Sequence, residues 1–115
     1  MATLDEAFAA ALTEASASVD PPMTRSAAVE FTIGKTQRLL LDVVDGRIVG
    51  AADDDREPDV SIPVTSDQLD GFVAGSESMT QAYMRGDLKP VGSTGALLPV
   101  LALFDDEGFR ASLSA

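Results

Sequence analysis

The side chains that most often carry enzyme chemistry are missing from this sequence. It contains no His and no Cys, and therefore lacks the commonest general base and the thiolate nucleophile. Carboxylates are plentiful, at 19 of 115 residues, but they fall mainly in predicted turns, helix caps and one acidic loop, where a solvated role explains them. A buried pair of carboxylates is the alternative that would support catalysis. The residues favour a protein that is not an enzyme and holds no cofactor.

Two motifs invite a ligand-binding interpretation, and a structural role explains each of them better. Adjacent carboxylates lie between Asp53 and Glu57, but their spacing lacks the alternating ligands and the distal Glu of an EF-hand loop. The run from Gly92 to Gly95 lacks the Gly-Lys-Ser/Thr sequence that supplies charge and metal contact in a phosphate loop. We interpret the first as a solvated turn and the second as a turn before a helix, and we predict no metal site.

The net charge of −11 limits the partners of this protein. An acidic surface repels nucleic-acid phosphates and anionic lipid headgroups, so no nucleic-acid partner is expected. No stretch approaches the ~18 apolar residues of a membrane span. The first residues lack the pattern of a secretory signal, and the last residues are not a peroxisomal address. We expect a cytoplasmic protein without stable membrane insertion, and its many Ala and Asp residues with few Lys residues suggest a bacterial origin.

The candidate binding residues are apolar. Aromatic residues make up only 5% of the sequence, so a core or pocket must be mostly aliphatic. Met suits irregular ligands because its side chain is unbranched and polarizable, and a Tyr hydroxyl offers an apolar pocket one polar group. Singly each candidate is better explained as ordinary core, and as a group they support more than a core, because their helices must all cover one sheet. The eight candidates are Phe72, Met79, Tyr83, Met84, Leu97, Leu98, Leu101 and Phe104.

The first half of the chain is predicted to form a helix followed by a strand meander. Thr3 and Glu6 have the spacing of a capping box, which opens a helix over residues 4–17. After a linker, alternating apolar residues predict strands over residues 28–33, 36–44 and 47–52. Gly34-Lys35 suits a two-residue type II′ turn between the first two strands, and Asp45-Gly46 suits a type I′ turn between the next two.

The second half is predicted to alternate strands and short helices. Alternating Val and Ile residues predict a strand over 60–64. Capping boxes at Thr65 and Ser78 open two short helices, which Gly75 and Gly86 close. A strand over 88–91 and an apolar helix up to residue 104 follow.

Two features shape the end of the chain. Pro99 is incompatible with a regular helix that runs through it from Gly95, so the last helix is expected to start near Leu98 or to kink. The acidic residues from Asp105 onward are unfavourable at a helix C-terminus and indicate a stop, with a short tail after it.

One stretch resembles the signature of the sterol carrier protein type 2 (sterol-binding-domain) family. In that family a Gly closes one helix, a short helix with Ala and aromatic residues follows, and then comes a Gly-x-Leu-Lys-x-x-Gly-x-x-Gly segment. Pro58-Asp59-Val60 also matches the usual opening of the preceding family strand. The sequence departs from the family at Pro90 and Pro99. The matching positions are Gly75, Ala82, Tyr83, Met84, Gly86, Leu88, Lys89, Gly92 and Gly95.

The resemblance implies a fold and a function. The expected fold is α/β (α+β), with a largely antiparallel sheet of about five strands and helices packed on one face around an apolar cavity. The expected domain is single: an N-terminal helix and linker over residues 1–26, a family-like core over 27–104 and a tail over 105–115.

The family binds or transfers a sterol, fatty acid or related lipid in an internal apolar tunnel, and the net charge favours a neutral lipid over acyl-coenzyme A. The alternative is a protein-interaction, dimerisation or accessory module that acts with a lipid-metabolising enzyme, as a homodimer or with that enzyme as partner.

Overall fold

The computed structural model describes residues 4–20, 24–53 and 55–114 of the chain and contains one five-stranded sheet. The strands lie in the order β3-β2-β1-β4-β5 across the sheet. Only β1 and β4 run parallel, and the other neighbouring pairs are antiparallel. The predicted sheet is therefore confirmed. Its strands are β1 (Ala27–Ile33), β2 (Gln37–Val44), β3 (Arg47–Ala51), β4 (Val60–Val64) and β5 (Val91–Gly92).

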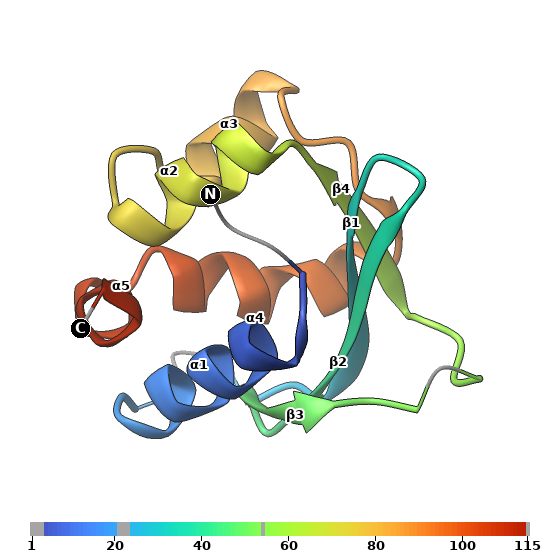
Figure 1. The fold of residues 1–115 in the computed structure, drawn as a ribbon, viewed down its shortest axis with the longest axis horizontal. Coiled ribbons are helices and arrows are strands. Elements are labelled where there is room, and N and C mark those ends of the chain that lie inside the picture. Colours follow the sequence, from blue (N-terminus) through green and yellow to red (C-terminus); the bar gives the residue numbers. More distant parts are fainter. Residues whose placement is uncertain (1–3, 21–23, 54, 115) are drawn as a thin grey trace.

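Five helices lie together on one side of this sheet (Figure 1), and the prediction that the helices cover one face is confirmed. One of them, α4, runs through the middle of the molecule beside β1 and β4, and the others surround it. The helices are α1 (Glu6–Ala17), α2 (Ser66–Ala74), α3 (Met79–Arg85), α4 (Thr94–Phe104) and α5 (Glu107–Ser114).

The turns of the meander follow local backbone requirements. Asp45 and Gly46 both have positive φ, at 52° and 81°, which is what a type I′ turn requires. The β1–β2 turn is longer than predicted, because Ile33 pairs with Gln37 and three residues lie between them. The predicted two-residue turn is wrong there, although Gly34 does adopt a positive φ of 59°.

The predicted N-caps of α2 and α3 are present. The Thr65 side chain accepts from the Gln68 backbone N–H at 3.0 Å, and the Gln68 side chain accepts from the Thr65 N–H at 2.9 Å. Ser78 caps α3 by accepting from Gln81 N–H. At α1 the cap is Asp5, which accepts from the N–H of Phe8. Thr3 of the predicted box lies outside the described residues.

Of the two predictions for the last long helix, a start near Leu98 is wrong, and a kink at Pro99 stays a prediction. Ser93 caps α4, and the helix runs from Thr94 through Pro99. Pro99 is the sixth residue of this helix, where it lacks the N–H that would bond to the carbonyl of Gly95 and its ring crowds that carbonyl. The buried side chains of Ala96 and Leu97 lie in the same first turns, and their packing offsets the lost bond. The strand predicted over residues 88–91 is also shorter than expected, because β5 contains only the two residues Val91–Gly92.

The predicted tail is in fact a helix. The Asp106 carboxylate accepts from the N–H of Phe109 at 3.0 Å, which is the contact that an N-cap makes. Phe109 is fully buried and its ring meets that of Phe104 edge to face, with centroids 5.3 Å apart. The acidic run therefore ends one helix and also opens the next.

The two faces of the sheet differ in what covers them. The inner face contributes Val29, Phe31 and Ile62 to a core shared with the helices. On the outer face Glu30 is 8% exposed, pairs with Arg38 and accepts a hydrogen bond from the Ser61 hydroxyl. Glu30 is therefore an exception to the prediction that the carboxylates lie in turns, helix caps and one acidic loop.

One backbone N–H on the β3 edge of the sheet is bonded to a helix side chain. Ile48 donates its backbone N–H to the hydroxyl of Ser16 at 2.9 Å, and Ser16 is fully buried on α1. Arg47 adds a bond to the carbonyl of Ala17. This contact fixes α1 against the sheet.

Candidate functional site

Helix α4 is the apolar centre of the molecule. Nearly every residue of this helix is apolar, and seven of its eleven residues are buried, while Thr94 and Leu98 are exposed on one stripe. Phe104 at its end lies edge to face with Phe31 of β1, with ring centroids 5.9 Å apart, and also touches Phe109. The helix therefore lies between the sheet and the other helices, with one stripe open to solvent. Its buried residues are Ala96, Leu97, Pro99, Val100, Leu101, Leu103 and Phe104.

The structure brings five of the eight candidate ligand-binding residues together. Those five are at most 4% exposed and belong to one continuous core: Phe72, Met79, Leu97, Leu101 and Phe104. Tyr83 is partly buried against the same core, and within the described residues its hydroxyl has no hydrogen-bond partner. Met84 and Leu98 lie apart from the cluster, at 79% and 41% exposed.

Helical spacing accounts for this separation. Met79 and Tyr83 are four residues apart on α3 and share its inner face, whereas Met84 follows one residue later and lies on another face. On α4, Leu97 and Leu101 share a face in the same way, and Leu98 is rotated off it.

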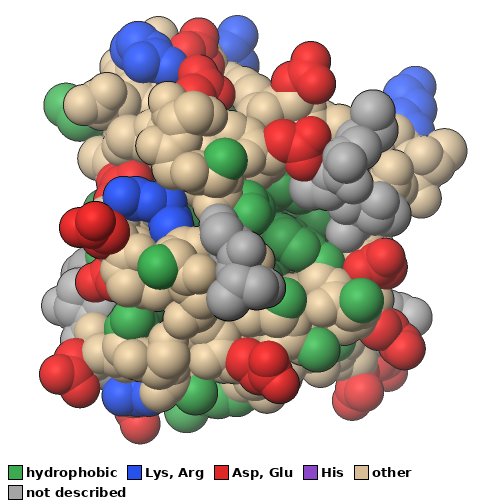
Figure 2. All heavy atoms as spheres, turned by 60° about the vertical axis from the view of Figure 1, so that its left-hand side comes forward, with side chains coloured by type: hydrophobic (Ala, Val, Ile, Leu, Met, Phe, Trp, Pro, Cys, Tyr) green, Lys and Arg blue, Asp and Glu red, His purple; other side chains and the backbone are tan. Residues whose placement is uncertain are grey.

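A hollow with a hydrophobic floor opens between the helices. Figure 2 shows hydrophobic side chains at the centre of this face, with α2 and α3 above them and α1 below. Four partly buried apolar residues on separate elements pack against the core: Phe8 of α1, Ile33 of β1, Val73 of α2 and Leu113 of α5. Phe8 and Val73 fit the apolar spacing of their predicted helices. Leu113 had no such signal once its segment was taken for a tail.

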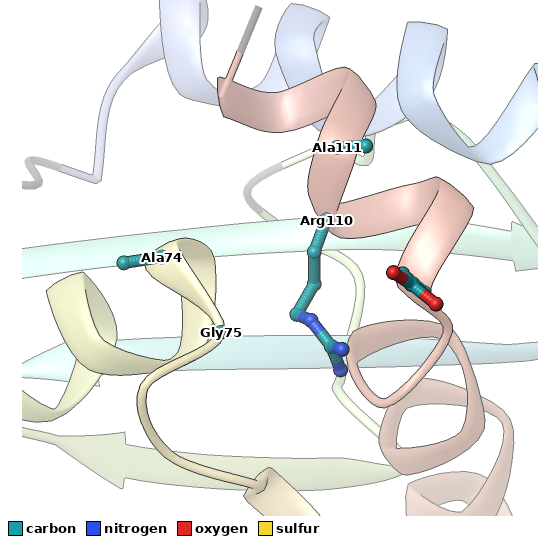
Figure 3. Close-up of a pocket in the computed structure, with 5 residues that line it drawn as sticks. Ala74, Gly75, Arg110 and Ala111 are labelled. Atoms are coloured by element: carbon teal, nitrogen blue, oxygen red, sulfur yellow. The ribbon is translucent and has the colours of Figure 1, made fainter.

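Beside that hollow, α2, α4 and α5 converge on one cation. Arg110 of α5 extends past Ala74 and Gly75, where α2 ends (Figure 3), and donates to the carbonyl of Phe104 at 3.2 Å. A notch of about 250 Å³ lies here, lined by Arg110 together with Ala74, Gly75, Glu107 and Ala111. Neither α2 nor α4 has a basic residue in its own last turn. Arg110 thus places positive charge where two helix dipoles are negative.

A second hollow lies on the opposite side of α1, against β3. It has a volume of about 410 Å³ and is lined by Glu6, Ala9, Ala10, Thr13, Glu14, Gly50 and Ala51. None of the eight candidate residues lines this hollow or the notch at Arg110. The hollow between α1 and β3 was not predicted from the sequence, because the outer face of an amphipathic helix carries no signal for a groove.

The carboxylates of the described residues do not form a metal site. Within the described residues no group of three or more Asp and Glu side chains is arranged to hold a metal ion. In the same part of the chain, every helix falls short of the length or apolarity that crossing a bilayer requires.

Comparison with known proteins identifies the family. The model of the SCP-2 sterol transfer family matches residues 8–105. The chain belongs to this family. The resemblance inferred from the Gly-rich segment is therefore confirmed, and the match includes α1, which the resemblance did not cover. The comparison with curated protein sequences gives no match.

Solved structures share the fold of this SCP-2 family member at low sequence identity. A crystal structure of sterol carrier protein 2 has a TM-score of 0.70 and 19% identity, with 97% of this chain and 98% of that chain covered. Palmitated SCP2L2 from Aedes aegypti has a TM-score of 0.63 and 13% identity, with 83% and 88% covered.

The fold also occurs inside a larger enzyme. The stereoselective inverting sec-alkylsulfatase Pisa1 from Pseudomonas sp. is similar over 88% of this chain but only 16% of its own, with a TM-score of 0.61 and 17% identity.

Proposed function

We propose that this SCP-2 family member binds or transfers a hydrophobic small molecule, a sterol, fatty acid or related lipid, without catalysing a reaction on it. Helix α4 carries the proposal, because nearly all of its residues are apolar, seven of them are buried, and it lies between the sheet and the other helices. Membership of the SCP-2 sterol transfer family supports it. The palmitated state of SCP2L2 supports it as well.

The proposed binding space lies between the inner face of the sheet and the helices α2 to α5. The eight candidate residues remain the predicted lining, and the hollow between α1 and α2 is the proposed opening (Figure 2). Five of these residues belong to one buried core. A ligand would therefore separate side chains that now fill the space, and Met79 is well suited to such adjustment.

The cations favour an uncharged ligand. Acyl-coenzyme A would require a basic surface for its phosphates. Arg38 pairs with Glu30, Arg85 pairs with Glu77 and Asp87, and Arg110 binds a helix carbonyl. With a net charge of −11, a neutral sterol or uncharged lipid is the better fit.

Binding of a fluorescent sterol or fatty-acid analogue tests the proposal, together with native mass spectrometry of the freshly purified protein. We expect a co-purified lipid and saturable binding with little dependence on salt, because apolar burial is poorly screened. Binding that collapses at moderate salt would favour acyl-coenzyme A instead.

Two Trp variants separate a pocket from solid core. If Leu101 lines a space that opens, Leu101→Trp should fold and block the analogue. In a packed core the same change would cost about 1–3 kcal/mol or more. Val91→Trp, at a residue 71% exposed, is the matched control and should leave binding intact. Leu41 of β2 is buried in the core, and Leu41→Ala should cost about 2–5 kcal/mol. A Leu101→Trp protein that unfolds as readily as Leu41→Ala would remove the tunnel from this segment.

The second candidate function is an accessory module that acts beside a lipid-metabolising enzyme. It is favoured by the sulfatase, in which the same fold makes up 16% of an enzyme chain. The exposed Leu98 on α4 is a candidate contact for such a partner or for a second copy. Light scattering over a wide concentration range tests self-association, and a constant monomer mass would argue against a homodimer.

A further inference from the structure

We infer that the hollow between α1 and β3 is a docking groove for a basic amphipathic helix of a partner protein. We name it the α1–β3 groove, lined by Glu6, Ala9, Ala10, Thr13 and Glu14 with Gly50 and Ala51. It lies on the other side of α1 from the proposed lipid opening, so this inference does not depend on lipid binding.

The shape of the groove admits a helix at close range. Its floor is built from small residues, with Ala9 and Ala10 on α1 and Gly50 and Ala51 on β3. The Thr13 hydroxyl donates to the carbonyl of Ala9 at 2.8 Å, so this polar group is already satisfied. No atom lies within 4 Å of the position that a Cβ on Gly50 would occupy. Helices pack with axes about 8–10 Å apart depending on the side chains between them, and small residues favour the shorter distance.

The rim of the groove is acidic. Glu6, Ala10 and Glu14 are exposed and recur every four residues along one face of α1, so the two carboxylates stand two turns apart, about 12 Å along the axis. Neither forms an ion pair with any described residue. Lys or Arg residues seven positions apart on a partner helix span a similar length, with apolar residues between them to enter the groove.

An adjoining hollow extends the negative charge. It shares Glu6 and Ala51 with the groove, has a volume of about 340 Å³ and adds the carboxylates of Asp5 and Asp53. Arg38 also lines it, but this guanidinium pairs with Glu30. In Figure 2 acidic side chains gather at the lower right, where α1 lies.

The negative charge at the α1–β3 groove decides which kind of partner fits it. Nucleic acid and anionic membranes would be repelled by the carboxylate rim. A second copy of this chain also carries a net charge of −11, and three of its Arg side chains already pair with its own carboxylates. A basic amphipathic helix supplies both the cations for the rim and the apolar face for the floor.

The test uses the full chain and a synthetic probe, an amphipathic Leu/Lys helix of about 15 residues, followed by heteronuclear NMR and calorimetry. We expect chemical-shift changes confined to residues 5–17 and 47–53, and binding that weakens as salt is raised. Glu6→Lys with Glu14→Lys should weaken the probe about tenfold or more. The same pair should leave binding of the lipid analogue unchanged.

Two further variants make the test specific. Glu57→Lys with Asp67→Lys changes the net charge by the same amount at exposed positions outside the groove, and should weaken the probe far less. Ala10→Trp should fill the groove and block the probe while preserving the fold. The inference is overturned if the probe fails to bind, if both charge pairs weaken it equally, or if the shifts centre on α2 and α5.

Discussion

Arg110 is the residue whose position says most about how the helices are held together. Its guanidinium lies at the C-terminal ends of α2 and α4, beside Gly75 and the carbonyl of Phe104 (Figure 3). Cations near helix C-termini stabilise by about 0.3–1 kcal/mol each, and by up to about 2 kcal/mol in partly buried sites. One side chain therefore links three helices.

Replacing Arg110 with Met should lower the free energy of unfolding by about 0.5–2 kcal/mol, because the helix carbonyl and both dipoles lose their cation. Urea denaturation at low and high salt measures the effect, which should shrink as salt screens the charge. Lys89→Met removes the same charge from an exposed residue and should have little effect. Equal losses in the two variants would assign the effect to net charge alone.

The carboxylate of Glu30 is the other residue whose surroundings matter. It is 8% exposed and depends on Arg38 and the hydroxyl of Ser61 for partners. Arg38→Met should destabilise the fold by about 1–3 kcal/mol, since it leaves a buried charge without its cation. Adding Glu30→Gln to Arg38→Met should recover part of that loss. Denaturant melts of the single and double variants give the comparison, and a double variant less stable than the single one would contradict this account.

At the scale of elements, α5 decides whether the core is closed. Phe109 is fully buried with its ring edge to face against Phe104, and Ser112 on the same helix forms a hydrogen bond to Ser18 at 2.9 Å. The segment that was predicted to be a tail thus contributes to the core. Its N-cap, Asp106, also separates α5 from α4.

Phe109→Ala should cost about 3–5 kcal/mol of stability, as expected for a large-to-small change in a packed core. Ala111→Gly on the exposed face of α5 is the control, and should cost only about 1 kcal/mol from helix propensity. Thermal melts of both variants test this difference. A Phe109→Ala protein as stable as the control would mean that α5 is peripheral after all.

Local signals explain which elements were predictable from the sequence. Alternating apolar residues and the box at Thr65 and Gln68 act over a few residues, and the corresponding strands and caps are present. The start of α4 and the existence of α5 depend on packing between distant segments, so Pro99 and the acidic run misled the prediction. Burial of a candidate such as Leu97 was expected, but periodicity is identical for a core residue and a pocket residue.

At the scale of the whole molecule, net charge opposes compactness. The folded chain carries a net charge of −11 within a radius of gyration of 12.5 Å, and self-repulsion of this kind destabilises a compact state. The melting temperature should therefore rise as salt is increased from about 0.01 M to about 0.15 M, because the Debye length falls from about 30 Å to about 8 Å. Calorimetry at fixed pH measures it. A melting temperature that falls over this range would show that the ion pairs outweigh the repulsion.

The bond between Ser16 and Ile48 also bears on solubility. An open sheet edge is a template on which further chains add strands, which leads toward aggregates and fibrils. Because the Ser16 hydroxyl already occupies the Ile48 N–H, the β3 edge offers one fewer free donor to an incoming strand. A buried hydroxyl on α1 thus removes one pairing position from the edge of the sheet, and Ser16→Ala should make that edge a better template for an added strand.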